Sequence, residues 1–156
     1  MVLRRTLTVG LLGGYDIFWR PAPAKVIHHR KKTSTALPNR EFVLVGISLH
    51  HCISLSVDDQ GFPLGAYVNI NLPPQPLANG WSWDDLELDW KLVVDYRRCW
   101  VPLLLDLPDF MAASLTPSQR EIALIETSSV LRRVNQRVFP FDCVQTPYLG
   151  LELPAI

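Results

Sequence analysis

The sequence has few cysteines, no excess of positive or negative charge and no long apolar segment, and each of these features excludes some classes of protein. Its three cysteines, Cys52, Cys99 and Cys143, are widely spaced and form no CxxC or Cys/His zinc pattern, so we expect small, buried thiols in a reducing compartment. No apolar run reaches the roughly 18–20 residues that cross a bilayer, so no membrane partner is expected. The apolar stretch within residues 1–14 is short and interrupted, which argues against a secretion signal and predicts a cytoplasmic location.

Size and charge favour one globular domain with an uneven distribution of charge. The 156 residues are 48% hydrophobic and 19% charged, and the 15 basic side chains equal the 15 acidic ones. We therefore expect a single domain over residues 1–156 and no overall field that attracts nucleic acid. The first 40 residues are basic with a single acid, Asp16, whereas residues 84–109 are acidic. This pairing suits a metal ion and an anionic substrate, although the basic arm also fits ordinary solvated charge.

Short segments separated by proline and glycine predict strands over the first two thirds of the chain. The 13 prolines oppose long helices there, and apolar, β-branched or alternating runs favour extended backbone. The predicted strands are residues 4–12, 16–19, 24–29, 42–49, 51–57, 65–71, 83–94 and 100–105. The polar stretch 31–39 and the proline-rich stretch 72–80 predict loops.

The pattern changes after residue 109, where helical features begin. Thr116 suits a helix cap and Pro117 suits the first helical position. Apolar residues then recur at helical spacing, which predicts a helix from Pro117 to Asn135 or Gln136. Strands followed by helix predict an α+β fold, an antiparallel β-barrel with C-terminal helices.

Three alternating carboxylates form the most informative segment. In a strand, Asp85, Glu87 and Asp89 share one face, while Leu86 and Leu88 point to the core. Like charges in a row repel one another, and a hard divalent cation that prefers oxygen ligands offsets that repulsion. The alternative is an exposed polar face of an amphipathic strand.

Three further residues extend the acidic pattern. Asp106 and Asp109 are three positions apart, so a tight turn or a first helical turn brings their carboxylates together; a helix cap and turn is the alternative. Asn69 lies between Val68 and Ile70 in an apolar run, where a buried amide needs a partner. A satisfied turn or edge position is the alternative for Asn69.

Taken in order, these segments resemble the FomD-like barrel family. The resemblance rests on residues 67–70 (YVNI), a proline-rich loop, residues 85–89 (DLELD) and residues 105–110 (LDLPDF), within a region from about residue 42 to 131. That family includes nucleoside tri- and diphosphate phosphatases and a hydrolase of a cytidylyl phosphonate. The resemblance implies an antiparallel barrel flanked by helices and one or two Mg²⁺ or Mn²⁺ ions.

Carried over position by position, the resemblance also implies a set of metal ligands. They are Asn69, Asp85, Glu87, Asp89, Asp106 and Asp109. Glu87 replaces an aspartate of the family and Asp109 replaces a glutamate, and Pro108 stands where many members carry another acid. Some members use an arginine near the N-terminus as a proton donor, for which Arg20 and Arg30 are the candidates here.

The predicted function is divalent-metal-dependent hydrolysis of a phosphate anhydride or phosphodiester, with a phosphorylated small molecule, a nucleotide, as partner. Lys91 would stabilise charge on the phosphoryl group, or form an ion pair with a neighbouring acid. Tyr67 would donate to a leaving oxygen, or form part of the barrel wall. The substrate-binding candidates in the basic arm are Arg30, Lys31 and Lys32.

Two other interpretations stay open at the level of sequence. An RNA- or nucleotide-binding barrel without catalysis would use the basic arm and the five tryptophans for stacking. A family member that has lost catalysis would account for the altered ligand positions. The histidine pairs at 28–29 and 50–51 are expected in loops or at the surface, and the sequence leaves the oligomeric state open.

Overall fold

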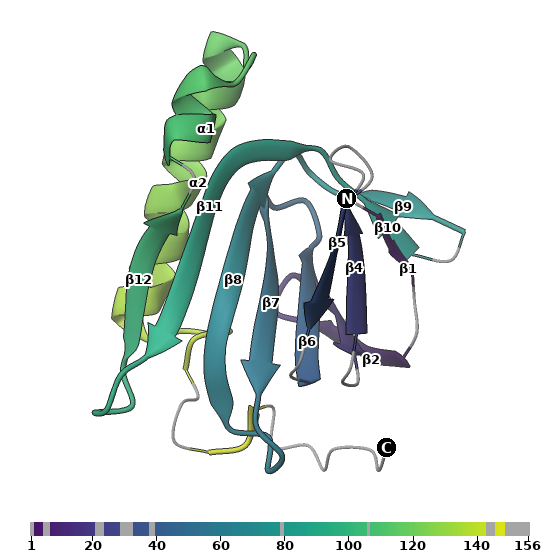
Figure 1. The fold of residues 1–156 in the computed structure, drawn as a ribbon, viewed down its shortest axis with the longest axis vertical. Coiled ribbons are helices and arrows are strands. Elements are labelled where there is room, and N and C mark those ends of the chain that lie inside the picture. The colour runs from purple at the N-terminus through teal and green to yellow at the C-terminus, as the bar shows by residue number, and fades with distance from the viewer. Residues whose placement is uncertain are drawn as a thin grey trace.

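The computed structural model describes residues 2–4, 7–20, 24–28, 33–37, 40–78, 80–105, 107–142 and 146–148 as an α+β fold in which antiparallel strands dominate. Its largest part is a seven-stranded sheet in the order β12-β11-β8-β7-β6-β3-β2 (Figure 1). The strands of this sheet are β2 (Leu7–Leu12), β3 (Tyr15–Arg20), β6 (Arg40–Gly46), β7 (His51–Val57), β8 (Pro63–Asn71), β11 (Asp85–Val94) and β12 (Trp100–Leu105).

Two smaller sheets and two helices complete the described structure. The first small sheet has the order β1-β10-β9, and the second joins β4 to β5. Their strands are β1 (Val2–Arg4), β9 (Gln75–Leu77), β10 (Gly80–Ser82), β4 (Ala24–His28) and β5 (Thr33–Leu37). The helices are α1 (Leu107–Ala112) and α2 (Pro117–Gln136), and none of the described helices is long and apolar enough to cross a membrane.

Most predicted strands are confirmed, and two predicted loops are corrected. β7 and β12 have the predicted bounds. The strand predicted over residues 4–12 falls on two strands of different sheets, β1 and β2, and the remaining predicted strands differ mainly at their ends. The loop predicted over residues 31–39 is wrong in its middle, because β5 pairs there with β4 in antiparallel register. Threonines at positions 33 and 35 favour extended backbone, whereas the prediction relied on the polarity of the stretch. The loop predicted over residues 72–80 likewise contains β9.

The sheet is antiparallel throughout, but the prediction of a closed barrel is not confirmed. Each neighbouring pair in the seven-stranded sheet runs antiparallel. Within the described ranges, the ladder begins at β12 and stops at β2, and no backbone pairing joins these two strands. The α+β class and the antiparallel architecture are therefore confirmed without barrel closure.

One face of the large sheet, here called the core face, forms the main hydrophobic core with α2. Alternate residues of each strand point to this face, as the period of two in a strand requires. Its fully or almost fully buried members include Ile17, Leu44, Ile53, Leu55, Val68, Ile70, Leu86 and Leu92 from the strands, and Ala123, Val130 and Val134 from α2. Each fully buried Val, Leu or Ile side chain contributes about 1.5–3 kcal/mol of hydrophobic stabilisation, so this face is the main hydrophobic core of the fold.

The predicted C-terminal helix is confirmed, including its start. The Thr116 side chain accepts from the backbone N–H of Gln119 at 3.1 Å, and the Gln119 side chain accepts from the N–H of Thr116 at 3.0 Å. This reciprocal capping box satisfies two backbone donors that helix geometry leaves open. Figure 1 shows both helices at the β11–β12 side of the sheet, and the indole N–H of Trp90 donates to Thr127 of α2 at 3.3 Å.

Candidate functional site

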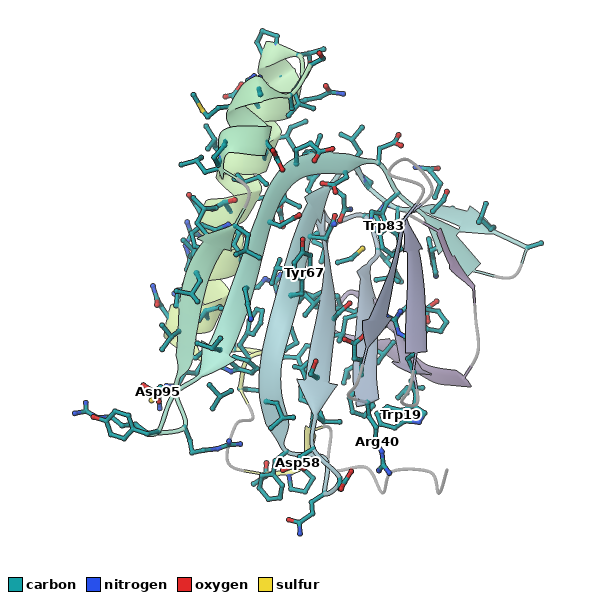
Figure 2. The ribbon with its side chains drawn as sticks, viewed as in Figure 1. Trp19, Arg40, Asp58, Tyr67, Trp83 and Asp95 are labelled. Atoms are coloured by element: carbon teal, nitrogen blue, oxygen red, sulfur yellow. The ribbon has the colours of Figure 1, made fainter. Side chains whose placement is uncertain are left out.

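The second face of the large sheet, here called the polar face, gathers the predicted site residues of β8 and β11. Because alternate residues of β8 enter the core, Tyr67, Asn69 and Asn71 point to the polar face. In the antiparallel ladder Asp89 is paired with Asn69, and Lys91 is paired with Tyr67. Residues paired in this way share a face of the sheet, so the structure brings four predicted site residues together. Figure 2 shows Tyr67 midway along β8.

The closest contact within this group joins Tyr67 to Asp89. The Tyr67 hydroxyl donates to Asp89 Oδ2 at 2.6 Å. Asp89 is only 5% exposed, whereas Tyr67 is partly exposed and Lys91 is exposed. A hydrogen bond to a carboxylate is short and strong, so it fixes the orientation of the Asp89 side chain at the edge of the buried region.

Asn69 contributes a buried oxygen that the described protein does not use. The side chain is 6% exposed, and its Oδ1 atom has no hydrogen-bond partner among the described residues. Asn69 lies between Cys52 of β7 and Asp89 of β11 in the ladder. Since a buried polar atom without a partner is costly, this oxygen is suited to a ligand, a cation or an ordered water molecule.

The carboxylates at 85 and 87 are held by an irregular segment rather than by a regular strand. Asp85 is paired with Asn71 and Asp89 with Asn69, so the stretch of β11 between them is longer than its partner on β8. Glu87 lies in the left-handed region at φ 60°, and its N–H donates to Asp85 Oδ1 at 2.7 Å. The expectation that Leu86 and Leu88 point to the core is confirmed, although a β-bulge interrupts the ladder between Asp85 and Asp89.

Of the two remaining predicted ligands, the structure describes one, Asp109. Asp109 lies exposed in the first turn of α1, which agrees with the expected first helical turn. Asp106 lies outside the described residues, as do Arg30, Lys31 and Lys32. Among the residues that the structure describes, no three His, Cys, Asp or Glu side chains are grouped closely enough to hold a metal ion.

The donors that are described nevertheless fit a hard cation in their chemistry. Asn69 offers a buried amide oxygen without a partner, and the carboxylate of Asp89 lies on the neighbouring strand. Both are oxygen donors, which Mg²⁺ and Mn²⁺ prefer. Leu105 of β12 is paired with Asp89 on the side of β11 away from β8.

Comparison with solved structures identifies the architecture around this face. FomD in complex with CDP matches with a TM-score of 0.69 and 17% sequence identity, over 95% of this chain and 82% of FomD. This chain has the fold of FomD. The resemblance to the FomD-like family that the sequence indicated is thus confirmed at the level of structure.

Two more structures share the FomD fold with this chain. The phosphatase SC4828 with the non-hydrolyzable nucleotide GPCP matches with a TM-score of 0.61 and 16% identity, over 91% of this chain and 84% of that protein. A DUF402 protein of unknown function from Rhodococcus sp. RHA1 matches with a TM-score of 0.54 and 18% identity, over 81% and 71% of the two chains. No family model and no curated protein matches the sequence.

A second hydrophobic cluster extends the polar face of this FomD-like fold toward β3. It comprises Phe18, Val43, Val45, Cys52 and Trp83, with Trp81 packed against it. The Trp81 indole N–H donates to Asp16 Oδ2 at 2.8 Å, which links β10 to the large sheet. Burial raises the pKa of the Cys52 thiol to about 12, so this side chain behaves as a small apolar group.

The expectation of buried cysteines is only partly borne out. Cys52 is buried, as expected, whereas Cys99 is partly exposed in the turn after β11. Cys143 lies outside the described residues. Cys99 follows Arg97 and Arg98 in this turn, and a turn position gives less cover than a strand in the middle of a sheet.

The candidate N-terminal arginine is engaged in an ion pair. Arg20 Nη2 lies 3.0 Å from Glu41 Oε2, at the end of β3 away from Asp16. Burial raises the pKa of the Glu41 carboxyl group, although the positive charge of Arg20 and a hydrogen bond with Ser56 oppose this effect. Arg20 therefore balances a buried acid in this structure. Arg30 lies outside the described residues.

A buried polar network on the core face was missed by sequence reasoning. His51 is completely buried, and its Nε2 atom lies 2.6 Å from the Tyr15 hydroxyl while its Nδ1 atom lies 2.5 Å from Glu126 Oε1. The expectation that the histidine pair at 50–51 occupies a loop or the surface is wrong for His51, which begins β7. The three partners come from β3, β7 and α2, so no local motif indicates the network. The only signal is that residue 51 falls in phase with the core positions of β7.

Proposed function

We propose that this chain is a divalent-metal-dependent hydrolase that cleaves a phosphate anhydride or phosphodiester bond of a nucleotide. The observation that carries the proposal is the Asn69–Asp89 pair, in which a buried amide oxygen without a partner lies beside an oriented carboxylate. Two proteins of the same fold have been solved with nucleotides, FomD with CDP and the phosphatase SC4828 with GPCP. These likenesses support a nucleotide as the substrate class.

The residues that would hold Mg²⁺ or Mn²⁺ are those of the polar face and its continuation. Asn69 and Asp89 are the central donors, and Asp85, Glu87, Asp106 and Asp109 are the further predicted ligands. A bound divalent ion neutralises phosphate oxygens and lowers the pKa of a water molecule. One or two ions are consistent with this number of oxygen donors.

For Tyr67 we propose a positioning role in place of donation to a leaving group. Its hydroxyl donates to Asp89 Oδ2, which supports a role in orienting the carboxylate. Lys91 is exposed on the same face, directly across the ladder from Tyr67. From that position its ammonium group would stabilise negative charge on a phosphoryl group, with Arg30, Lys31 and Lys32 as further predicted phosphate contacts.

The burial of the tryptophans argues against the RNA-binding alternative. All five tryptophans lie within the described residues, and none of them is exposed: Trp19 and Trp83 are buried, and the other three are partly buried. Stacking on single-stranded RNA requires accessible aromatic faces. The metal-dependent hydrolase therefore accounts better for the polar face than a stacking platform does.

The proposal is tested by measuring phosphate release from a panel of nucleoside di- and triphosphates and nucleotide diesters with Mg²⁺ or Mn²⁺. We expect turnover by the wild-type protein that is lost on chelation and in Asp89→Asn. The control is Asp59→Asn, which makes the same change at an exposed turn and should retain full activity. Turnover that survives both chelation and Asp89→Asn would overturn the proposal, as would the absence of turnover with every substrate and metal.

A further inference from the structure

Arg120 has a position in α2 that the helix itself does not favour. It follows the N-cap residue, Thr116, by four positions, at the end of the first turn. The positive end of the helix dipole lies there, so a positive side chain is unfavourable. The first turn of α2 contains no acidic residue that would compensate. The reason for an arginine at this position therefore lies in its contacts outside α2.

The guanidinium group of Arg120 reaches the C-terminal end of α1. Nη1 donates to the carbonyl oxygen of Phe110 at 2.8 Å, and Nη2 donates to that of Ala113 at 2.6 Å. A longer contact joins Nη2 to the carbonyl oxygen of Met111 at 3.5 Å. Since the last carbonyl groups of an α-helix lack a regular intrahelical partner, Arg120 supplies donors that α1 needs.

The same guanidinium group also lies over the ring of Phe110. The Arg120 Cζ atom is 5.3 Å from the centre of this ring, which is within the range of a cation–π contact. Phe110 is 4% exposed and anchors α1 in the main hydrophobic core. Because a helix of six residues is too short to be stable by itself, α1 depends on this anchor and on Arg120.

The helix that Arg120 holds begins near the candidate site. β12 ends at Leu105, the ladder partner of Asp89, and α1 starts two residues later at Leu107. Two residues span at most about 7 Å, and α1 packs against β11 (Figure 1). Asp109, a predicted metal ligand, lies in the first turn of α1, directly before Phe110. The contacts that fix α1 therefore also fix the backbone of Asp109.

We propose that Arg120 is a positioning residue, which holds α1 so that Asp109 is a ligand of the same metal ion as Asp89. Arg120 acts through the backbone of α1 and the ring of Phe110, and it touches neither the metal nor the substrate. This role rests on the proposed function, because the metal site is the one proposed there. It also explains a positive charge in the first turn of α2, where the dipole of that helix opposes it.

The first test is a double-mutant cycle on the Mn²⁺ affinity of the purified protein, measured by calorimetry without substrate. Arg120→Gln removes the paired donors, and Asp109→Asn removes the carboxylate while keeping its shape. We expect each single substitution to lower the Mn²⁺ affinity by about tenfold or more, and the double variant to bind no more weakly than Asp109→Asn. Additive losses would overturn the positioning role, as would a wild-type affinity in either single variant.

The second test needs no metal. In the metal-free protein, the backbone amides of α1 should exchange hydrogen faster in Arg120→Gln than in the wild type. Arg120→Lys keeps the charge but lacks the planar fork that reaches two carbonyl groups, so we expect it to restore protection and Mn²⁺ affinity only in part. This variant decides the matter if Arg120→Gln does not fold.

The matched control is Arg132→Gln, at an exposed position of the same helix. It should change neither the exchange of α1 nor the Mn²⁺ affinity, because Arg132 lies three turns away from the start of α2. Wild-type exchange of α1 in both Arg120 variants would overturn the proposed role.

The outcomes separate the role of Arg120 from the proposed function. Faster exchange of α1 and coupled losses of Mn²⁺ affinity, with no turnover on any nucleotide, would uphold the positioning role and overturn the hydrolase. Turnover that depends on Asp89, with additive losses at Arg120 and Asp109, would uphold the hydrolase and overturn the positioning role.

Discussion

The hydroxyl group of Tyr67 and the Oδ2 atom of Asp89 lie 2.6 Å apart, across a diagonal of the β8–β11 ladder. Asp89 is itself opposite Asn69, so the tyrosine acts on a carboxylate that lies next to a buried amide oxygen without a partner. We infer from this relationship that Tyr67 is a positioning residue. Its hydroxyl restricts the rotation of Asp89 and leaves the amide oxygen of Asn69 available to a ligand.

Removal of this hydroxyl should weaken the site without unfolding the protein. In Tyr67→Phe we expect Mn²⁺ affinity and kcat/KM to fall by about 10- to 100-fold, the usual effect of losing a group that orients a metal ligand. Tyr96→Phe is the matched control, because Tyr96 is 86% exposed in the turn after β11. A Tyr67→Phe protein with wild-type Mn²⁺ affinity, measured by calorimetry, would show that Asp89 needs no such support.

The Tyr15–His51–Glu126 network should make folding sensitive to acid. Burial alone would raise the pKa of Glu126, but the hydrogen bond and charge of His51, with the charges of His50 and Arg133, hold it below its ordinary value. A carboxyl group with a lowered pKa in the folded state stabilises the fold above its unfolded pKa. That contribution is lost as the pH falls through the lower, folded value.

We therefore expect the free energy of unfolding of the wild type to decline below about pH 4.5 more steeply than that of Glu126→Gln. Urea titrations at a series of pH values measure this slope. Glu121→Gln, an exposed position of the same helix, should leave the slope of the wild type unchanged. Parallel pH profiles for the wild type and Glu126→Gln would show that the network does not stabilise the ionised carboxylate.

The capping box at the start of α2 should contribute measurably to stability. Thr116→Ala removes the acceptor for the N–H of Gln119, and the loss of such a cap costs about 1 kcal/mol. Urea denaturation should show this decrease in the free energy of unfolding at an unchanged m-value. Ser128→Ala, within the exposed face of the same helix, should change the stability by less than about 0.5 kcal/mol.

The backbone conformation of Glu87 can be separated from the chemistry of its side chain. At φ 60° a residue other than glycine is strained, so Glu87→Gly should raise the free energy of unfolding of the metal-free protein by about 0.5–1 kcal/mol. The same change at Glu121, in a regular helix, should lower it by about 1 kcal/mol. If the Glu87 carboxylate also binds the metal, Glu87→Gly should lose part of the stabilisation that Mn²⁺ gives the wild type in the same denaturation experiment.

Local patterns in the sequence sufficed for the elements and for part of the site. Alternation in β7 predicted its bounds, an apolar run predicted those of β12, and Thr116 with Pro117 predicted the start of α2. The strands that carry Asn69 and Asp89 were also predicted, and their pairing follows from the order of the sheet. These features depend on neighbours close in the chain, which a period of two or 3.6 residues reveals.

The features that depend on residues far apart in the chain could not be predicted from local sequence patterns. His51 binds a tyrosine 36 residues before it and a glutamate 75 residues after it, and neither spacing has a local signature. The bulge between Asp85 and Asp89 was not predicted, because the alternation of residues 85–89 in the sequence is regular. Asn71 was not singled out from the sequence. The lack of a hydrogen-bond partner for its Oδ1 atom among the described residues depends on the positions of all the polar groups around it.

Alternate residues of β8 serve two different purposes: one set packs in the core and the other lies on the polar face. Ala66, Val68 and Ile70 supply the apolar contacts of the core, whereas Tyr67, Asn69 and Asn71 face the other side of the sheet. A single-residue insertion before them would exchange the two sets and bury the polar one. The length of this strand is therefore constrained by the packing of the core as well as by the residues of the polar face.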